Sequence, residues 1–278
     1  MFGRTIWSYW QQGLEHAPEL VRLCLESWRR RNPDWRMIVL DERSLASAVD
    51  MAALGTLDRR DITVQKISAL GRLSLLREHG GVWVDATVFC RKPLDAWLPE
   101  HAASGFFAFA NPGVDRLMSN WFIAAQRDHV LLDELHAAFS ALWRDNVYWN
   151  QHTRAGAFVV RKLSPMLSKD VPRTRYWLSW PIRKVLGVYP YFQFHYAFNR
   201  LVMNDARCRD AWAAVKPFSA DPPHRLLFHF HRGDDADVAI EDIASSTTPM
   251  YKLDWRMDPA TPYWSAVLDR LRATLPAA

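Results

Sequence analysis

The sequence predicts an α/β protein with a mostly parallel central sheet. Segments typical of strands and helices alternate through the first third of the chain, which is the pattern of a parallel sheet with crossover helices. The 278 residues are 49% hydrophobic and 23% charged, so the chain can bury a sizeable core. A double glycine, Gly80-Gly81, separates a long amphipathic segment from a short apolar one, which is typical of a helix followed by a strand.

The predicted elements of the first part follow in order. Thr5 to Trp10 is a β-branched and aromatic run and predicts a strand. A helix follows Pro18, with an apolar face at helical spacing that comprises Leu20, Val21, Cys24, Leu25 and Trp28. Trp35 to Leu40 predicts a second strand, and Thr63 to His79 a helix that the two glycines end. Val82 to Val84 predicts a third strand that delivers Asp85 to its tip.

The second part is mixed. Its predicted strands are Phe106–Ala110, Asn120–Ala125 and Leu226–His231. Its predicted helices are His129–Trp143, Thr153–Leu167 and Thr261–Leu275. We find no internal repeat and no linker long enough to separate two independent domains.

Composition and motifs exclude several classes. The net charge of +5 suits anionic small molecules or an anionic membrane surface as partners. The sequence has no long Lys/Arg stripe of the kind that indicates nucleic-acid binding. The three cysteines are widely spaced and predict reduced, buried thiols. The patterns GxGxxG, GxxxxGK, GxSxG, HExxH and CxxC are all absent. The start of the chain lacks the apolar run of a signal peptide, so we expect a cytoplasmic protein.

Asp85 is the strongest candidate for chemistry. Ligands of parallel α/β sheets bind beyond the carboxyl ends of the strands, where Asp85 is expected. Its carboxylate is a hard oxygen ligand for Mg²⁺ or Mn²⁺, and Arg72 on the preceding helix could add a bidentate phosphate contact. The alternative is an ordinary helix–turn–strand unit with a surface aspartate.

Three blocks resemble a known family. The first block is IWSYWQQG at 6–13, followed by SW at 27–28 and NPDW at 32–35. The second is RLSLLREHGGVWVDATVF at 72–89. The third is weaker and consists of SNWFIAA at 119–125, YPYFQFHYAF at 189–198 and MYKLDW at 250–255. In this order they resemble the capsular polysaccharide synthesis proteins, which are related to the DXD-containing family 32 glycosyltransferases and the glucosylating toxins. The middle block is the specific one.

The resemblance implies a GT-A-type nucleotide-sugar-binding fold with a helical acceptor-side lobe, a divalent metal (Mn²⁺ or Mg²⁺) and retention of anomeric configuration. It implies that Trp7 lies near the nucleobase, Arg72 contacts the sugar nucleotide, Asp85 holds the metal, Asn120 faces the donor sugar and Lys252 binds the diphosphate. We therefore expect a single domain over residues 1–278. Residues 1–125 are expected to form its nucleotide-sugar-binding half and residues 126–278 its acceptor-side half. The second half would also contribute residues that bind the metal and the phosphates.

Two positions depart from the family pattern. Ala69 stands where an acidic residue is common three positions before the arginine, and Thr87 occupies the third position of the metal motif. A hydroxyl can ligate the metal but adds no charge. We expect a further ligand from His231 or His229, which would share one face of a strand. The alternative is a pair of histidines with hydrogen-bond partners at a strand end.

The resemblance thus implies a hexosyltransferase-type enzyme for capsule, lipopolysaccharide or exopolysaccharide synthesis. It would move a sugar from a nucleotide-sugar donor to a glycan or lipid-linked acceptor. Two alternatives stay open: a non-catalytic nucleotide- or glycan-binding relative, and a glycoside hydrolase, which needs two facing carboxylates. The basic-aromatic segment Arg173–Lys184 suits peripheral association with the inner face of the membrane, or is a solvated helix of the acceptor lobe.

Overall fold

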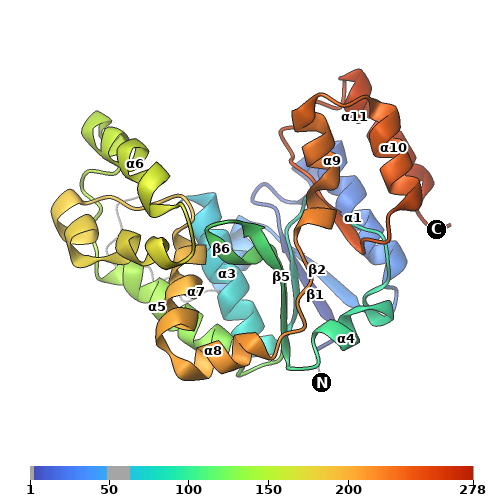
Figure 1. Cartoon of the computed structure of the whole chain (residues 1–278). Helices are drawn as coiled ribbons and strands as arrows, with labels where there is room; N and C mark the ends of the chain where they lie inside the picture. Colours follow the sequence, from blue (N-terminus) through green and yellow to red (C-terminus); the bar gives the residue numbers. More distant parts are fainter. Residues whose placement is uncertain (1–2, 49–62, 278) are drawn as a thin grey trace.

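A five-stranded sheet lies at the centre of the computed structural model, which describes residues 3–48 and 63–277 (Figure 1). The strand order is β2-β1-β3-β6-β5. These strands are β1 (Thr5–Tyr9), β2 (Arg36–Leu40), β3 (Gly81–Val84), β5 (Phe106–Gly113) and β6 (Arg116–Ala125).

The sheet is parallel across β2, β1 and β3, as the alternation of strands and helices predicts. Helix α1 (Glu19–Arg31) connects β1 to β2, and α3 (Val64–His79) precedes β3. Gly80 and Gly81 have φ of +66° and +101°, which end α3 and turn the chain into β3. A Cβ on Gly81 would lie 2.5 Å from the Thr5 carbonyl oxygen, so glycine lets β3 lie beside β1.

The other two strands run antiparallel, so the central sheet is mixed. β6 pairs antiparallel with both β3 and β5. The short link accounts for the β5–β6 pairing, because only Val114 and Asp115 join these strands and a parallel pair needs a crossover of a dozen or more residues. Both strands were predicted, but the parallel expectation holds only for β2, β1 and β3.

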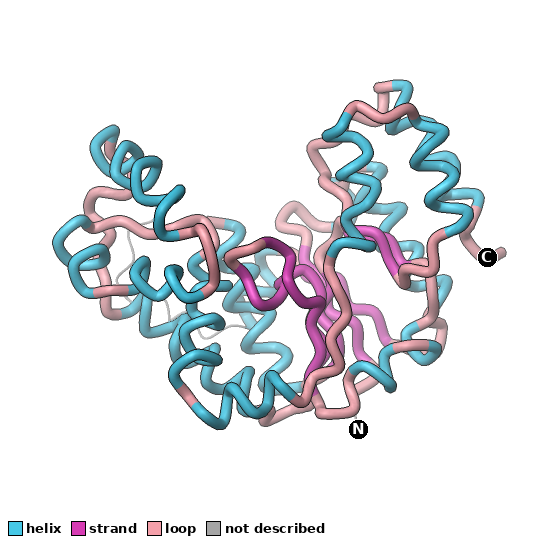
Figure 2. Tube along the Cα trace, viewed as in Figure 1, coloured by secondary structure: helices cyan, strands magenta, loops and turns pink. Residues whose placement is uncertain are grey.

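Helices cover both faces of the sheet (Figures 1 and 2). On one side lie α3, α5, α7 and α8, and on the other α1, α9, α10 and α11. The helices not yet given are α2 (Glu42–Ala48), α4 (Leu98–His101), α5 (Val130–Arg144), α6 (Arg154–Leu167), α7 (Gln193–Asn204), α8 (Ala206–Ala213), α9 (Asp221–Arg232), α10 (Ala236–Ser245) and α11 (Pro262–Ala273). The expected helical lobe corresponds to α5–α8.

The predicted strand Leu226–His231 is wrong, because these residues belong to helix α9. Pro222 and Pro223 occupy the first helical turn, where the missing N–H groups cost nothing. The apolar residues Pro223, Leu226, Leu227 and Phe230 then recur at the spacing of one helical face. The alternation of histidine and phenylalanine at 228–231 resembles the pattern of a strand. It is shorter than the helical pattern of apolar residues, which runs from 223 to 230.

A second, two-stranded sheet joins distant parts of the chain. β4 (Val88–Cys90) pairs antiparallel with β7 (Met250–Lys252), and Val88 stands opposite Lys252. Neither strand is predicted from the sequence, because runs of three residues carry too little pattern. This pairing places Lys252 beside the turn that follows Asp85.

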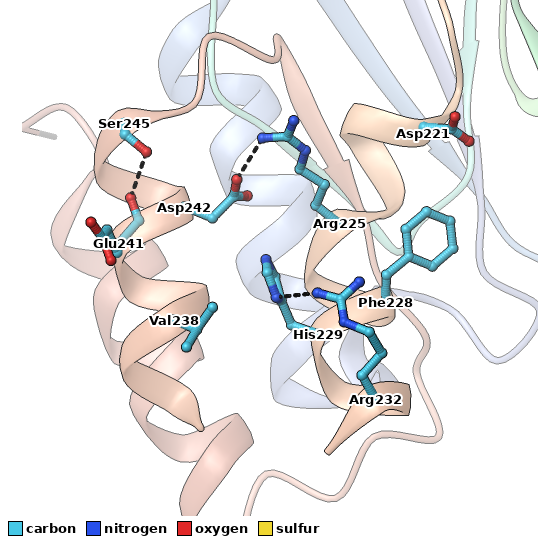
Figure 3. Close-up of a pocket in the computed structure, with 9 residues that line it drawn as sticks. All are labelled: Asp221, Arg225, Phe228, His229, Arg232, Val238, Glu241, Asp242 and Ser245. Atoms are coloured by element: carbon cyan, nitrogen blue, oxygen red, sulfur yellow. Dashed lines mark hydrogen bonds and ion pairs between the residues drawn. The ribbon is translucent and has the colours of Figure 1, made fainter. Parts of the chain in front are cut away.

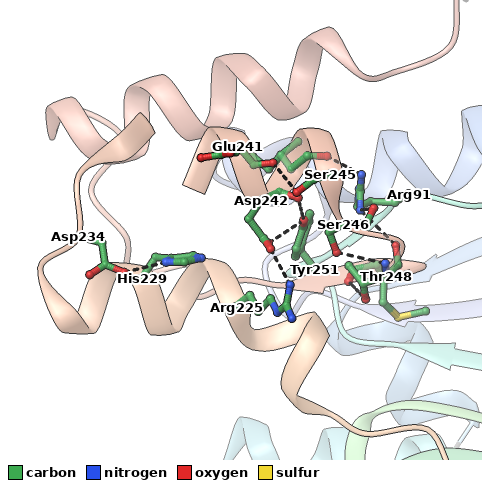
Figure 4. Close-up of polar contacts among 12 residues, drawn as sticks. Arg91, Arg225, His229, Asp234, Glu241, Asp242, Ser245, Ser246, Thr248 and Tyr251 are labelled. Atoms are coloured by element: carbon green, nitrogen blue, oxygen red, sulfur yellow. Dashed lines mark hydrogen bonds and ion pairs between the residues drawn. The ribbon is translucent and has the colours of Figure 1, made fainter. Parts of the chain in front are cut away.

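A buried polar network fixes β7 against the helices behind it (Figure 4). The Arg91 guanidinium donates to the carbonyl oxygens of Ile243, at 2.6 Å, and Ser246, at 2.7 Å. The Tyr251 hydroxyl donates to the Asp242 carboxylate at 3.0 Å. Burial raises the pKa of Tyr251, which keeps it protonated as a donor.

The predicted basic-aromatic segment Arg173–Lys184 forms short irregular helices rather than one regular helix. A 3₁₀ helix covers Pro172–Leu178, and a π-helical turn covers Pro181–Leu186. Cys24, Cys90 and Cys208 are free and buried, as predicted. Within residues 3–48 and 63–277, no helix has both the length and the apolar composition needed to cross a membrane.

Candidate functional site

Asp85 lies directly after β3, at the carboxyl end of the parallel strands. Its backbone N–H donates to the Trp121 carbonyl oxygen at 2.8 Å, which ties it to β6. Its Oδ1 accepts hydrogen bonds from Trp83 Nε1 at 3.0 Å and from the Arg72 guanidinium at 3.3 Å. The side chain is 29% exposed, so the carboxylate is anchored on one side and accessible on the other.

Arg72 projects from the middle of α3 into the same region and is almost fully buried, with a side chain 5% exposed. Its guanidinium donates to the Ser68 Oγ and to the Asn120 carbonyl oxygen, and its Cζ lies 5.1 Å from the centroid of the Trp83 ring. Burial lowers the pKa of Arg72, and Asp85 opposes this effect. Because an arginine keeps its proton in proteins, Arg72 holds a fixed positive charge beneath Asp85.

Lys252 reaches the same turn from β7. Its Nζ donates to Thr87 Oγ1 at 2.6 Å and to the Leu253 carbonyl oxygen at 2.8 Å. Burial lowers the pKa of Lys252, whereas the nearby carboxylates of Asp85 and Asp254 raise it. An ammonium has three donors, so one N–H of Lys252 has no partner within the described residues and remains for a ligand.

Asn120 joins this cluster, whereas Trp7 does not. The carbonyl oxygen of Asn120 accepts from Arg72, and its partly exposed side chain has no hydrogen bond within the described residues. The Trp7 indole donates to the Gly80 carbonyl oxygen at 3.0 Å and stacks on His79. Trp7 stands beside Trp83 in the β1–β3 register, but its indole is held at Gly80, which lies at the opposite end of β3 from Asp85.

The structure also separates the expected metal ligands. His231 is exposed in the last turn of α9, and His229 Nδ1 pairs with the Asp234 carboxylate at 2.7 Å. In a helix, residues two apart do not share a face, so the geometry that suggested a histidine ligand is absent. The Thr87 hydroxyl accepts from Lys252. No cluster of three His, Cys, Asp or Glu side chains that could hold a metal occurs in the described part of the chain.

The side chains at this site offer fewer anionic oxygens than a divalent ion requires. Asp85 is the only one of the proposed ligands that presents an anionic oxygen at the site, and one of its oxygens is already held by Arg72 and Trp83. Mg²⁺ and Mn²⁺ favour several oxygen ligands, with carboxylates to balance their charge. The described side chains therefore do not fit a metal held by Asp85, Thr87 and His231 together.

Three further basic side chains, His224, His195 and Arg116, lie near the cluster and were not predicted from the sequence. His224 packs its ring edge-on against Trp121, with centroids 5.5 Å apart. Burial lowers the pKa of His224, and Lys252 and Arg116 lower it further. His195 is buried on α7 near Arg72 and Arg116. Only the turn of α9 that contains His224 reaches the site, and His231 lies about 10 Å farther along the helix.

His195 makes the stability of the protein depend on pH. Burial, with the charges of Arg116 and Arg72, lowers its pKa to about 3, against about 6.5 in an unfolded chain. The unfolded state therefore takes up the proton first, and stability falls as the pH drops from about 6.5 toward 3. We expect His195→Gln to flatten the dependence of the melting temperature on pH in this window, measured by calorimetry. Equal slopes for this variant and for His16→Gln, at an exposed histidine, would contradict the assignment.

Aromatic side chains flank the cluster where β1 ends. Trp10 follows β1 and meets Trp255 edge-on, with ring centroids 6.2 Å apart. Trp255 is 50% exposed, so this pair lies at the surface. The buried Ser8 Oγ, Tyr9 hydroxyl and Trp10 Nε1 have no hydrogen-bond partner within the described residues. Burial and the nearby acidic groups raise the pKa of Tyr9 to about 12, so its hydroxyl stays a donor.

A separate pocket lies between α9 and α10 (Figure 3). Its two arginines are already held, with Arg225 2.9 Å from Asp242 and Arg232 2.7 Å from His229. None of the residues that line it belongs to the cluster around Asp85. We therefore place the functional site at the carboxyl end of β3 and not in this pocket.

Known proteins resemble about half of the chain. The O-glycosyltransferase braB of Annulohypoxylon truncatum is 28% identical over 160 residues, which cover 50% of this chain and 38% of that protein. The glycosyltransferase afumC of Aspergillus fumigatus is 31% identical over 159 residues, covering 50% and 40%. The matched part thus spans about two-fifths of these relatives.

Two solved structures share a low similarity with the chain. They are the PaToxG glycosyltransferase, at 16% identity and a TM-score of 0.36 over 67% of this chain and 79% of that one, and the glycosyltransferase domain of the YGT toxin, at 11% identity and a TM-score of 0.45 over 99% of both.

The family comparison covers the site itself. The model of the capsular polysaccharide synthesis protein family matches residues 2–154, which include β1, α3, β3 and the turn with Asp85 and Thr87. This match covers more than half of the chain and agrees with the resemblance of its middle block. The chain belongs to the capsular polysaccharide synthesis protein family.

Proposed function

We propose that this protein is a GT-A-type glycosyltransferase that uses a nucleotide-sugar donor. The observation that carries the proposal is the convergence of Arg72, Lys252 and Asp85 at the carboxyl end of β3, where ligands of parallel sheets bind. Two cations around one carboxylate suit a diphosphate, which is doubly charged and needs hydrogen-bond donors. The names of the fungal relatives support a glycosyltransferase as well.

In this proposal, the positive charges stabilise the departing nucleoside diphosphate. The acceptor hydroxyl oxygen bonds to the anomeric carbon of the donor, and the bond from that carbon to the phosphate oxygen breaks. The leaving phosphate takes the hydroxyl proton, which would allow transfer on the same face with retained configuration. Arg72 supplies a fixed positive charge, and the unused N–H of Lys252 donates to a phosphate oxygen.

We assign to Lys252 the charge that the resemblance attributes to a divalent metal. Its ammonium binds the Thr87 hydroxyl, the group expected as the second metal ligand, and lies near the carboxylates of Asp85 and Asp254. An ammonium adds one positive charge and directed hydrogen bonds, which suits a motif that has lost its second carboxylate.

The pair of Trp10 and Trp255 is the proposed contact for the nucleobase. Both indoles offer flat faces, and Trp10 also has a free indole N–H within the described residues. Base–aromatic stacking contributes about 1–3 kcal/mol per base, so we expect Trp10→Ala to weaken binding of the matched nucleoside diphosphate by about 5- to 160-fold. Trp180→Ala, at an exposed tryptophan in another part of the molecule, is the control. Equal affinities for the two variants, by calorimetry, would remove the nucleobase role.

Binding of nucleoside diphosphates tests the proposal. We expect one of UDP, GDP, CDP, ADP and dTDP to bind the whole protein in calorimetry with EDTA present, and Lys252→Met to weaken that binding. Failure of all five to bind, with EDTA or with Mn²⁺, would overturn the assignment of a nucleotide-sugar donor.

The acceptor we propose is a hydroxyl of a glycan or a lipid-linked glycan in capsule, lipopolysaccharide or exopolysaccharide assembly. Family membership supports this pathway class. A non-catalytic nucleotide- or glycan-binding relative is the second candidate, favoured by Ala69 and Thr87 at positions that are usually acidic. Release of sugar from a bound donor would distinguish the enzyme from this candidate.

A further inference from the structure

The exposed apolar side chains gather in one segment. Of the fourteen large hydrophobic residues that are exposed in the described part of the chain, eight lie within residues 147–191. They are Val147, Trp149, Phe158, Met166, Tyr176, Trp180, Val185 and Tyr191. Single exposed apolar residues are normal, but more than half of them in about one-sixth of a chain mark an interaction surface.

The same segment also carries the excess of positive charge of the chain. Residues 147–191 hold eight basic residues and one acidic residue, a net charge of +7, whereas the rest of the chain has 27 against 29 and a net charge of −2. The basic residues are Arg154, Arg161, Lys162, Lys169, Arg173, Arg175, Arg183 and Lys184, and the acidic residue is Asp170. A mildly basic composition for the whole protein thus conceals one strongly basic segment, and the partner it suits is anionic.

Helix α6 combines the two properties. Only Gly156 and Leu167 are buried among its fourteen residues, and the helix stands at one end of the molecule, away from the central sheet (Figure 1). Phe158 is 52% exposed, and both Arg161 Cζ and Lys162 Nζ lie 5.6 Å from the centroid of its ring. An exposed aromatic ring flanked by cations is the composition of helices that lie in the interface of a bilayer.

The irregular helices after α6 continue this surface. Tyr176 is 47% exposed and Trp180 63% exposed, and Arg175 lies over the Tyr176 ring with its Cζ 4.9 Å from the centroid. Tryptophan and tyrosine are enriched at the headgroup level of membranes, where an apolar ring and a polar edge are both accommodated. A nucleic acid or other soluble polyanion would use the charges but would leave the aliphatic side chains, such as Met166 and Val185, without a partner.

We propose that residues 147–191 bind the surface of a bilayer that contains anionic lipids. The apolar side chains enter the boundary between headgroups and acyl chains, and the basic ones pair with lipid phosphates. The surface lies outside the cluster around Asp85 and needs no nucleotide. The inference therefore goes beyond the proposed function and stands independently of it.

Sedimentation of the whole protein with vesicles tests this inference. We expect at least tenfold stronger binding to vesicles of phosphatidylcholine with 30% phosphatidylglycerol than to pure phosphatidylcholine, and a loss of binding in 0.5 M salt. Arg161→Glu with Lys162→Glu should lower the binding at least tenfold. Phe158→Ser with Trp180→Ser should lower it similarly, because less apolar area then enters the interface.

Matched controls use exposed residues outside the segment. Val114→Ser should not change the binding, and neither should Arg43→Glu with Arg127→Glu. Equal binding to neutral and anionic vesicles, an equal loss in the control variants, or capture by RNA or heparin with no binding to vesicles would each overturn the inference. Nucleoside diphosphate binding by the same variants is read separately, so failure of the membrane surface is distinguishable from failure of the nucleotide site.

Discussion

Lys252→Met is expected to lower donor turnover at least a hundredfold while leaving the protein folded. Removal of one group that stabilises the charge developing in a transition state costs about 10²–10³ in rate. Methionine preserves the length of the side chain but removes the positive charge and the hydrogen bonds to Thr87 and Leu253. The rate of sugar release from the matched donor, with EDTA present, is the measurement.

Two controls sharpen this prediction. Lys216→Met removes an exposed lysine that pairs with Glu100, and its turnover should stay within twofold of the unmodified protein. Adding Thr87→Asp to Lys252→Met provides a second carboxylate in the turn, and we expect Mn²⁺ to restore part of its activity. If the unmodified protein loses its turnover in EDTA and recovers it with Mn²⁺, the assignment of the charge to Lys252 is wrong.

Asp85→Asn is expected to lower donor turnover at least a hundredfold and to lower the melting temperature modestly. The amide can still accept from Trp83, but it no longer balances the buried charge of Arg72. Arg72 keeps its bonds to Ser68 and Asn120, so we expect a loss of stability of about 1–2 kcal/mol rather than unfolding. Turnover and thermal unfolding measured on the same preparation separate the two effects.

Asp95 offers a matched control for this variant. Its carboxylate also accepts from one tryptophan indole and one arginine, Trp35 at 3.2 Å and Arg4 at 2.7 Å, but at an exposed site. Asp95→Asn should therefore leave turnover within twofold. Similar losses in the two variants would show that an aspartate bonded in this way matters for structure and not for the donor.

The parts of the fold predicted from sequence are those with a long local pattern. α1 and α3 each show a repeated apolar face, and the glycines after α3 fix the start of β3, so Asp85 and Arg72 could be placed together. The direction of β6 was not predicted, because it depends on a pairing with β3 far earlier in the chain. β4 and β7 are three-residue strands that owe their conformation to each other.

The candidate site was predicted in part for the same reason. Lys252 was expected to bind the diphosphate, but its bond to Thr87 arises from the β4–β7 pairing and carries no local signal. Trp7 and Trp10 both lie in the first aromatic run, and the resemblance pointed to Trp7, although Trp10 is the one at the end of the predicted strand. The two prolines at 222–223 are typical of the first turn of a helix and were the sequence signal for α9. A helix there would have favoured His224, in the same turn, over His231 as the histidine near the site.

The most direct test of the glycosyltransferase assignment is sugar release from a panel of UDP-, GDP-, CMP-, ADP- and dTDP-sugars, with and without a mixture of glycan acceptors. The expected result is turnover of one donor, inhibition by the matching nucleotide product, and little change on adding EDTA. No release from any activated donor by a protein that binds the nucleotide would contradict it and favour a non-catalytic role. Release of sugar from unactivated glycans alone would instead favour a hydrolase.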